Sequence, residues 1–165
     1  MESKRSKHEN PINKLVRLAM GAIRSHYPNV PSHAIPKPRY TDKTSNGLTR
    51  CIVDYINLNG YQAERINSTG RILDSRKKTL GSFGSATLGG VRWIKSSSQN
   101  GTADISATIR GRSVKIEVKC KATGDNYQSQ AQKDYQEKIE QAGGIYLIAR
   151  DFWDFFTWYH KFTKS

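Results

Sequence analysis

The sequence predicts an α/β fold in which a mixed sheet is flanked by helices and preceded by an N-terminal helical arm. Three observations predict it. Apolar residues recur at helical spacing in residues 11–27 and 46–59. Residues 114–120 alternate strictly between apolar and polar, which is typical of a half-buried strand. Residues 145–149 form a short apolar run of the length of a buried strand.

The N-terminal part is expected to be a basic helix and a linker over residues 1–43, followed by a core over residues 44–165. Four prolines between residues 28 and 38 lack the backbone donor and disfavour helix before them, so they predict an extended linker. The apolar stripe of the helix consists of Leu15, Leu18, Ala19, Ala22 and Ile23.

The first half of the core is expected to begin with the helix over 46–59. A strand over residues 61–66 and a turn at 67–70 follow. Residues 74–90 are rich in glycine, serine and basic residues, which indicates a mobile basic loop, and strand signals resume at 91–94.

The second half of the core is expected to form a hairpin, a helix, a strand and a last helix. Ser129 can cap a helix that runs to about Ala142, where two glycines end it. The run at 145–149 predicts a strand buried on both faces. An aromatic-rich helix over about 151–162 is expected to pack its aromatic stripe inward rather than to stack it on bases.

The charge indicates a polyanionic partner. The chain has 27 basic and 14 acidic residues, a net charge of +13 and a pI of about 9.9. Each phosphate that a cation neutralises releases counterions, so this excess favours nucleic acid. No apolar run approaches the roughly 20 residues of a membrane span, and no membrane partner is expected.

Composition also bounds the compartment and the metal chemistry. The basic N-terminus is not followed by an apolar signal segment, so a cytoplasmic location is expected. Cys51 and Cys120 are too few for a disulfide framework or a cysteine zinc site, and each falls on an apolar face, as buried free thiols do. The four histidines show no ligand spacing.

Two carboxylates and a lysine are expected to meet on one face of the hairpin. Glu117 and Lys119 share a face because strand side chains alternate. If Arg110 and Gly111 form a two-residue turn, Asp104 lies directly opposite Glu117, and a one-residue change in loop length would shift that pairing.

Such a cluster is suited to phosphodiester hydrolysis. Carboxylate oxygens that converge on one point are ligands for a hard divalent ion such as Mg²⁺. Lys119 can orient an attacking water or stabilise charge on the phosphate. The alternative is that Glu117 and Lys119 are ordinary charges on a solvated strand face and that Asp104 is a turn residue.

A longer set of motifs resembles a known family. In order along the chain the motifs are Arg65-Ile66-Asn67, Gly101-Thr102-Ala103-Asp104-Ile105, Ile116-Glu117-Val118-Lys119, Gln132-Lys133-x-Tyr135 and Gly143-Gly144. Together they resemble the PD-(D/E)XK nuclease superfamily, and within it the VRR-NUC (virus-type replication-repair nuclease) domain, over residues 46–158.

The resemblance implies a restriction-endonuclease-like core that hydrolyses DNA with Mg²⁺ or Mn²⁺ as cofactor. By motif position, Asp104, Glu117 and the backbone carbonyl of Val118 would bind the metal. Lys119 would be the catalytic lysine, and Gln132 would help to organise the site. Nucleases of this kind act on branched, flapped or junction DNA in phage or bacterial replication and repair, and a homodimer is one option.

The chain departs from the family pattern at two places. Ala103 replaces the usual proline. The helix over 46–59 has no glutamate where many members have one, and Thr49 lies near that position. This absence leaves open a catalytically inactive DNA-binding module on the same fold, and charge alone does not distinguish DNA from RNA.

Four polar residues outside the cluster are candidates for binding the DNA backbone. They are Arg65, Asn67, Arg71 and Arg92. Phosphate contacts are spread widely over such interfaces, so the alternative for each residue is an exposed charge without a partner on DNA. Arg76, Lys77 and Lys78 in the expected basic loop have the same two interpretations.

Overall fold

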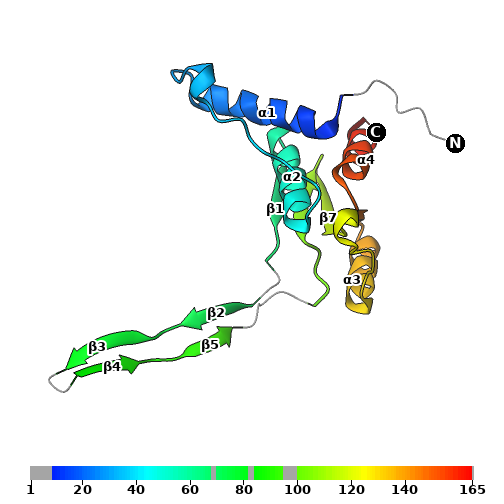
Figure 1. Cartoon of the computed structure of the whole chain (residues 1–165). Coiled ribbons are helices and arrows are strands. Elements are labelled where there is room, and N and C mark those ends of the chain that lie inside the picture. Colours follow the sequence, from blue (N-terminus) through cyan, green and yellow to red (C-terminus); the bar gives the residue numbers. More distant parts are fainter. Residues whose placement is uncertain (1–8, 68–69, 82–83, 95–99, 165) are drawn as a thin grey trace.

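The computed structural model describes residues 9–67, 70–81, 84–94 and 100–164 and has a mixed α/β core (Figure 1). The strands of its sheet lie in the order β1 (Gln62–Arg65), β6 (Ile105–Ile109), β7 (Arg112–Val118) and β8 (Ile145–Ala149). The first two pairs are antiparallel, and β7 and β8 are parallel. The predicted mixed sheet flanked by helices is therefore confirmed.

The predicted helices are confirmed to within about two residues at each end. They are α1 (Pro11–His26), α2 (Ser45–Leu58), α3 (Gln130–Gln141) and α4 (Phe152–Lys164). Helix α2 packs on β1, β6 and β7, α3 packs on β8, and α1 crosses α2 and also contacts α4 (Figure 1). Asn10 and Thr44 cap α1 and α2 by accepting backbone amides.

The β6–β7 hairpin has the register that the sequence predicts. Arg110 and Gly111 have φ angles of 52° and 75°, as a two-residue type I′ turn requires. Ile109 pairs with Arg112 and Ile105 with Ile116, so the turn contains two residues. Hydrophobic side chains from both strands then face α2 together.

An aromatic cluster joins α2 to α4. Tyr55 is fully buried, and its ring lies 5.2 Å from that of Tyr159 and 5.7 Å from that of Phe152, both edge-on. Its hydroxyl shares a 3.0 Å hydrogen bond with His160 Nε2. The predicted inward packing of the aromatic stripe is confirmed, with the exception of Trp153, whose exposed fraction is 44%.

The segment between α1 and α2 lies on the core and is held there by two thiols. It contains a short 3₁₀ turn, Ser32–Ala34. The Cys51 thiol donates to the Thr41 carbonyl (3.5 Å) and the Cys120 thiol to the Asp42 carbonyl (3.3 Å). Both cysteines are buried and free, as predicted. Division of the chain at residue 44 stays a prediction.

The predicted mobile loop over 74–90 is wrong, because most of the described residues in this range form strands. Strand β2 (Arg71–Asp74) pairs with β5 (Val91–Ile94), and β3 (Lys77–Gly81) pairs with β4 (Gly84–Leu88). Together, residues 70–81 and 84–94 make a β-ribbon that projects from the core (Figure 1). Both of its faces are exposed, so it lacks the alternation that marks a half-buried strand.

Three other expectations, for residues 91–94, 67–70 and 145–149, have different outcomes. The strand at 91–94 is present but belongs to the β-ribbon rather than to the core sheet. The turn at 67–70 includes residues 68 and 69, which lie outside the described residues. Strand β8 is not buried on both faces: it is an edge strand, and all of it except Ala149 keeps partial exposure.

Among the described helices, none combines the length and the apolar character needed to cross a bilayer. The remaining short element of the core is a 3₁₀ turn, Lys121–Thr123, which follows β7.

The separation of β-ribbon and core predicts different effects on stability. Replacement of residues 71–94 by a short glycine-serine linker should change the core melting temperature by no more than about 3 °C, because the β-ribbon contributes nothing to the hydrophobic core. Ile116→Ala should cost about 2–5 kcal/mol, because it opens a cavity at a fully buried position. Thermal and urea unfolding followed by circular dichroism measure both, and a large destabilisation by the linker would contradict this division.

Candidate active site

The candidate site lies on the face of the β6–β7 hairpin that points away from α2. Ile116 is buried in the hydrophobic core, so its neighbours Lys115 and Glu117 face the other way. On that second face, Lys115 Nζ donates to Ser106 Oγ on the paired strand (2.6 Å). Asp104 precedes Ser106 by two residues and is directed to the same face.

The structure brings Asp104 and Glu117 together. The observed register continues to place residue 104 opposite residue 117 just beyond the last recorded pair. The Val118 amide donates to Asp104 Oδ2 (2.9 Å), which fixes this carboxylate against β7. The Asp104 carbonyl accepts from the Ile66 amide (2.7 Å), which ties the same residue to the end of β1.

Glu117 is a buried carboxyl with a shifted pKa. Its exposed fraction is 3%. Burial, and after it the charge of Asp104, raise its pKa to about 7, while Lys119 acts in the opposite direction. Tyr146 on β8 donates from its hydroxyl to Glu117 Oε2 (3.5 Å), and burial followed by the charge of Glu117 raises the pKa of this phenol. The carboxyl is therefore in a position where a cation would be favourable.

Lys119 places an ammonium group between two carboxylates. Its Nζ lies 3.5 Å from Glu117 Oε1 and 3.3 Å from Asp125 Oδ1. The Lys119 amide donates to the Ala149 carbonyl (2.9 Å), so the backbone stays attached to β8 just beyond the end of β7. The side chain is 10% exposed, and two carboxylates compensate the charge of its ammonium group.

Gln132 connects the start of α3 to Glu117. Its Nε2 donates to Glu117 Oε1, and its Oε1 accepts from the Ser129 amide (2.9 Å). The Gln132 amide in turn donates to Ser129 Oγ (3.3 Å), which completes a capping box. One side chain thus satisfies a helix end and orients a candidate metal ligand.

Gly101 allows the segment before Asp104 to approach α3. Its φ of +80° lies in the region that favours glycine. A Cβ atom there would collide with the Ala131 carbonyl and would lie 2.7 Å from the Gln132 amide nitrogen. Glycine at this position therefore keeps the Asp104 segment and the first turn of α3 in contact.

Two site residues are absent from the expectations drawn from the sequence. Asp125 lies in an irregular segment without a pattern that could have placed it next to Lys119. Tyr146 gave one usable signal: it is the single polar residue in an otherwise apolar strand, and alternation along β8 directs it to the face opposite Ile145. Parallel pairing of Tyr146 with Lys115 then brings it to the Glu117 side.

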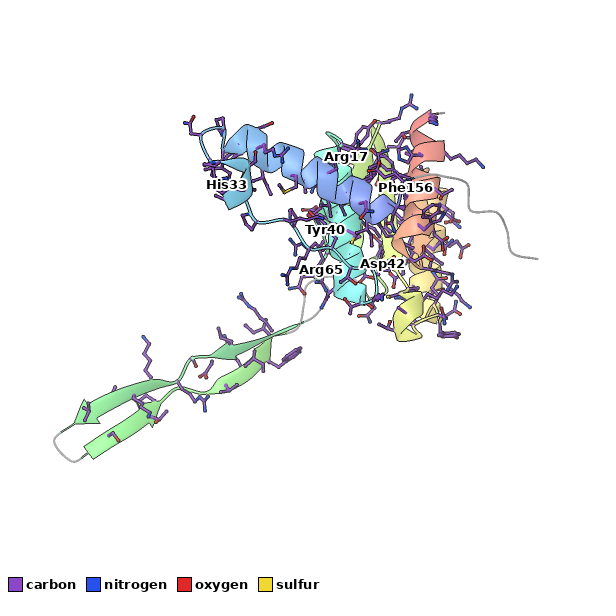
Figure 2. All side chains as sticks on the ribbon, turned by 45° about the horizontal axis from the view of Figure 1, so that its top comes forward. Arg17, His33, Tyr40, Asp42, Arg65 and Phe156 are labelled. Carbon is purple, nitrogen blue, oxygen red and sulfur yellow. The ribbon has the colours of Figure 1, made fainter. Side chains whose placement is uncertain are left out.

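The candidate DNA-binding residues are divided between core and β-ribbon. Arg65, which lies where the β-ribbon leaves the core (Figure 2), ends β1 and pairs with Ile105, the residue after Asp104. Asn67 follows it and is exposed. Arg71 and Arg92 lie on the exposed strands β2 and β5.

The helix position that lacks a glutamate is occupied by a buried threonine. Thr49 has an exposed fraction of 5%, and its hydroxyl donates to the Ser45 carbonyl within α2 (2.8 Å). Ala103, where the resemblance implies a proline, is fully buried.

Comparison with protein-family models, with curated proteins and with solved structures found no match for this chain. The resemblance described above therefore stays a prediction from the residues.

The raised pKa of Glu117 predicts that an uncharged side chain at this position stabilises the protein, and that the gain in stability depends on pH. The folded value of about 7 lies above the ordinary 4.5, so the folded state binds this proton more tightly than the unfolded chain, and stability falls as pH rises between these values. In metal-free buffer Glu117→Gln should be more stable than the parent at pH 8, by at most about 3 kcal/mol, with little difference near pH 4.5. Urea unfolding across this pH range measures the effect. Glu137→Gln, on the exposed face of α3, is the matched control, and equal pH profiles for both variants would refute the assignment.

The close approach at Gly101 predicts a second effect on stability. Gly101→Ala should destabilise the protein more than Gly60→Ala, although both residues have positive φ, because no atom lies within 4 Å of a Cβ at Gly60. The backbone strain shared by both is about 1–3 kcal/mol. Chemical denaturation measures the difference, and equal losses would show that contact with α3 is unimportant.

Proposed function

We propose that this chain is a metal-dependent nuclease that hydrolyses DNA phosphodiester bonds on a restriction-endonuclease-like core of the PD-(D/E)XK type. One observation carries the proposal: Asp104, Glu117, Lys119 and Gln132, predicted as a set from separate motifs, converge on one face of the β6–β7 hairpin. An ordinary solvated strand face would not bury Glu117 and Lys119 together.

The donor atoms suit Mg²⁺ or Mn²⁺. Asp104, Glu117 and the backbone carbonyl of Val118 would supply hard oxygen ligands. Within the described residues, no group of three or more histidine, cysteine, aspartate or glutamate side chains is arranged to hold a metal. The other coordination positions are therefore left to the peptide carbonyl, to water and to a substrate phosphate. When bound, such an ion polarises the phosphodiester and lowers the pKa of water.

Lys119 and Gln132 have distinct roles in this proposal. Lys119 is buried beside Glu117, where its ammonium can orient the attacking water and stabilise the charge that develops on the phosphate. Gln132 positions Glu117 through its amide and does not need to touch the substrate. The water oxygen bonds to phosphorus as one P–O ester bond breaks, which leaves a phosphate end and a hydroxyl end.

The substrate class follows from charge and from the resemblance. The net charge of +13 favours a polyanion, and the family resemblance points to branched, flapped or junction DNA in phage or bacterial replication and repair. The contrasting candidate is a DNA-binding module without cleavage. Thr49 favours this candidate, because α2 has a buried hydroxyl near the position where the resemblance implies a glutamate carboxylate.

The deciding experiment measures cleavage of linear, flapped and four-way DNA with Mg²⁺, Mn²⁺ or chelator. Asp104→Asn and Lys119→Ala should each reduce the cleavage rate by about 10² or more, because each removes charge from the reacting centre, while DNA binding persists.

Matched controls separate site chemistry from a general loss of charge. Asp134→Asn and Lys138→Ala change exposed residues of α3 and should cleave at the parental rate. Unchanged cleavage by Asp104→Asn and Lys119→Ala would reject these residues as the catalytic centre. Binding by the parent without metal-dependent cleavage of any substrate would favour the non-cleaving module.

A further inference from the structure

The β-ribbon exposes apolar side chains that a free surface does not ordinarily display. The exposed fractions are 92% for Leu80, 65% for Ile72, 63% for Trp93, 61% for Leu88 and 51% for Val91. An isolated two-stranded ribbon is at best marginally stable in water. The β-ribbon projects from the core, and its side chains extend to both sides (Figure 2), so they are accessible to a binding partner.

The root of the β-ribbon adjoins the candidate active site. The chain leaves the core after Arg65 and re-enters it through Gly101 toward Asp104. The Ile66 amide donates to the Asp104 carbonyl, so the two ends of the insertion meet at the residue that carries the first candidate carboxylate. The root of the β-ribbon therefore lies next to Asp104.

The β-ribbon is one continuous element, because hydrogen bonds connect its strands between the β2–β5 pair and the β3–β4 pair. The Ser75 amide donates to the Gly90 carbonyl (3.0 Å), and the Gly90 amide donates to Ser75 Oγ (3.2 Å). Gly89 has a φ of +95°, and a Cβ atom there would collide with the Ser75 carbonyl. The β2–β5 and β3–β4 pairs are thus continuous through this contact.

Cations lie on both faces of the β-ribbon. Arg71 and Arg92 share one face of the β2–β5 pair, by the observed register. Lys77 and Lys78 are consecutive in β3 and so point to opposite faces. Among the described residues of the β-ribbon the acidic side chain is Asp74, whose carboxylate is already bound by the Arg76 guanidinium at 2.7 and 2.9 Å.

This distribution fits nucleic acid better than a second copy of the chain. The cations of the β-ribbon outnumber its described acidic residue, so a second copy packed against it would bring like charges together, which is unfavourable. A DNA groove has phosphates along both walls and base edges, including thymine methyl groups, on its floor. Cations on both faces of a ribbon with apolar side chains between them complement that shape.

The dimensions agree with this assignment. The major groove of B-DNA is wide enough for a two-stranded β-ribbon. Residues 71–81, at about 3.3 Å each, extend roughly 35 Å. The axial length of one turn of B-DNA is about 34–36 Å, and the groove winds around the axis over a longer path, so the β-ribbon spans part of one turn of groove. The major groove of an A-form RNA duplex is too narrow for such an element.

We propose that the β-ribbon lies in the major groove of duplex DNA, over part of one helical turn, next to the phosphate that the candidate active site would hydrolyse. This inference rests on the proposed function for the presence of a scissile phosphate, but the binding part is independent of cleavage. It specifies the substrate as DNA with a duplex segment next to the cut.

The test uses the full chain in chelator, with fluorescence anisotropy on labelled DNA duplexes of about 8, 16 and 24 base pairs. Affinity per site should rise with duplex length until the duplex is long enough to contact the whole β-ribbon. Lys77→Gln combined with Lys78→Gln should weaken binding to the longest duplex by roughly tenfold or more. The same double variant should lower the slope of log affinity against log salt by nearly 2, about 0.9 for each lost phosphate contact.

The matched control removes two exposed cations far from the β-ribbon, by Arg24→Gln combined with Lys37→Gln, and should leave both values unchanged. An RNA duplex of the same sequence should bind without sensitivity to the Lys77 and Lys78 substitutions. Unchanged DNA affinity in the Lys77/Lys78 variant would overturn the proposal. Sedimentation that shows a dimeric parent and a monomeric variant, with DNA affinity intact, would assign the β-ribbon to self-association instead.

Cleavage of the same DNA with Mg²⁺ is measured separately, so the two proposals can fail independently. Metal-dependent cleavage with no effect of the β-ribbon substitutions would retain the nuclease and reject the groove assignment. Absence of cleavage, together with the predicted loss of affinity, would retain the groove assignment and reject the nuclease.

Discussion

The two-residue turn at Arg110 and Gly111 is the constraint on which the candidate site depends. It sets the β6–β7 register, and that register directs Asp104 to the same face as Glu117. The opposite face of the hairpin carries Ile105 and Ile116, both fully buried. A slip of one residue would turn these side chains outward, so burial of apolar surface enforces the meeting of the carboxylates.

Charge compensation around Glu117 couples the site to the fold. Burial and Asp104 favour the protonated form of this carboxyl, whereas Lys119 favours the ionised form. Gln132 adds a donor without adding charge, and it also caps α3. Because one amide side chain serves both purposes, rearrangement of the site would require the first turn of α3 to change as well. The carboxylate is thus held by folding rather than by a mobile loop.

Elements with one buried face were predictable, and elements without one were not. The sequence predicted α2 and β7 because burial of one face repeats apolar residues at helical spacing in α2 and at every second position in β7. The two-residue turn between β6 and β7 was predicted as well. The β-ribbon has no buried face, so its composition indicated a loop. Asp125 comes close to Lys119 only through the path of an irregular segment, which leaves no periodic signal. Tertiary packing, rather than local preference, decides such cases.

The two native thiols have a practical consequence. Burial raises the pKa of the Cys51 thiol to about 12, and Cys51 and Cys120 are both fully buried and hydrogen-bonded to the segment before α2. Both sulfurs are shielded from solvent, and thiolate, the reactive form, is disfavoured at Cys51, so neither sulfur reacts readily with maleimides while the protein is folded. A cysteine engineered into an exposed strand can therefore carry a spectroscopic label selectively, with the natural sulfurs left in place as internal reporters of unfolding.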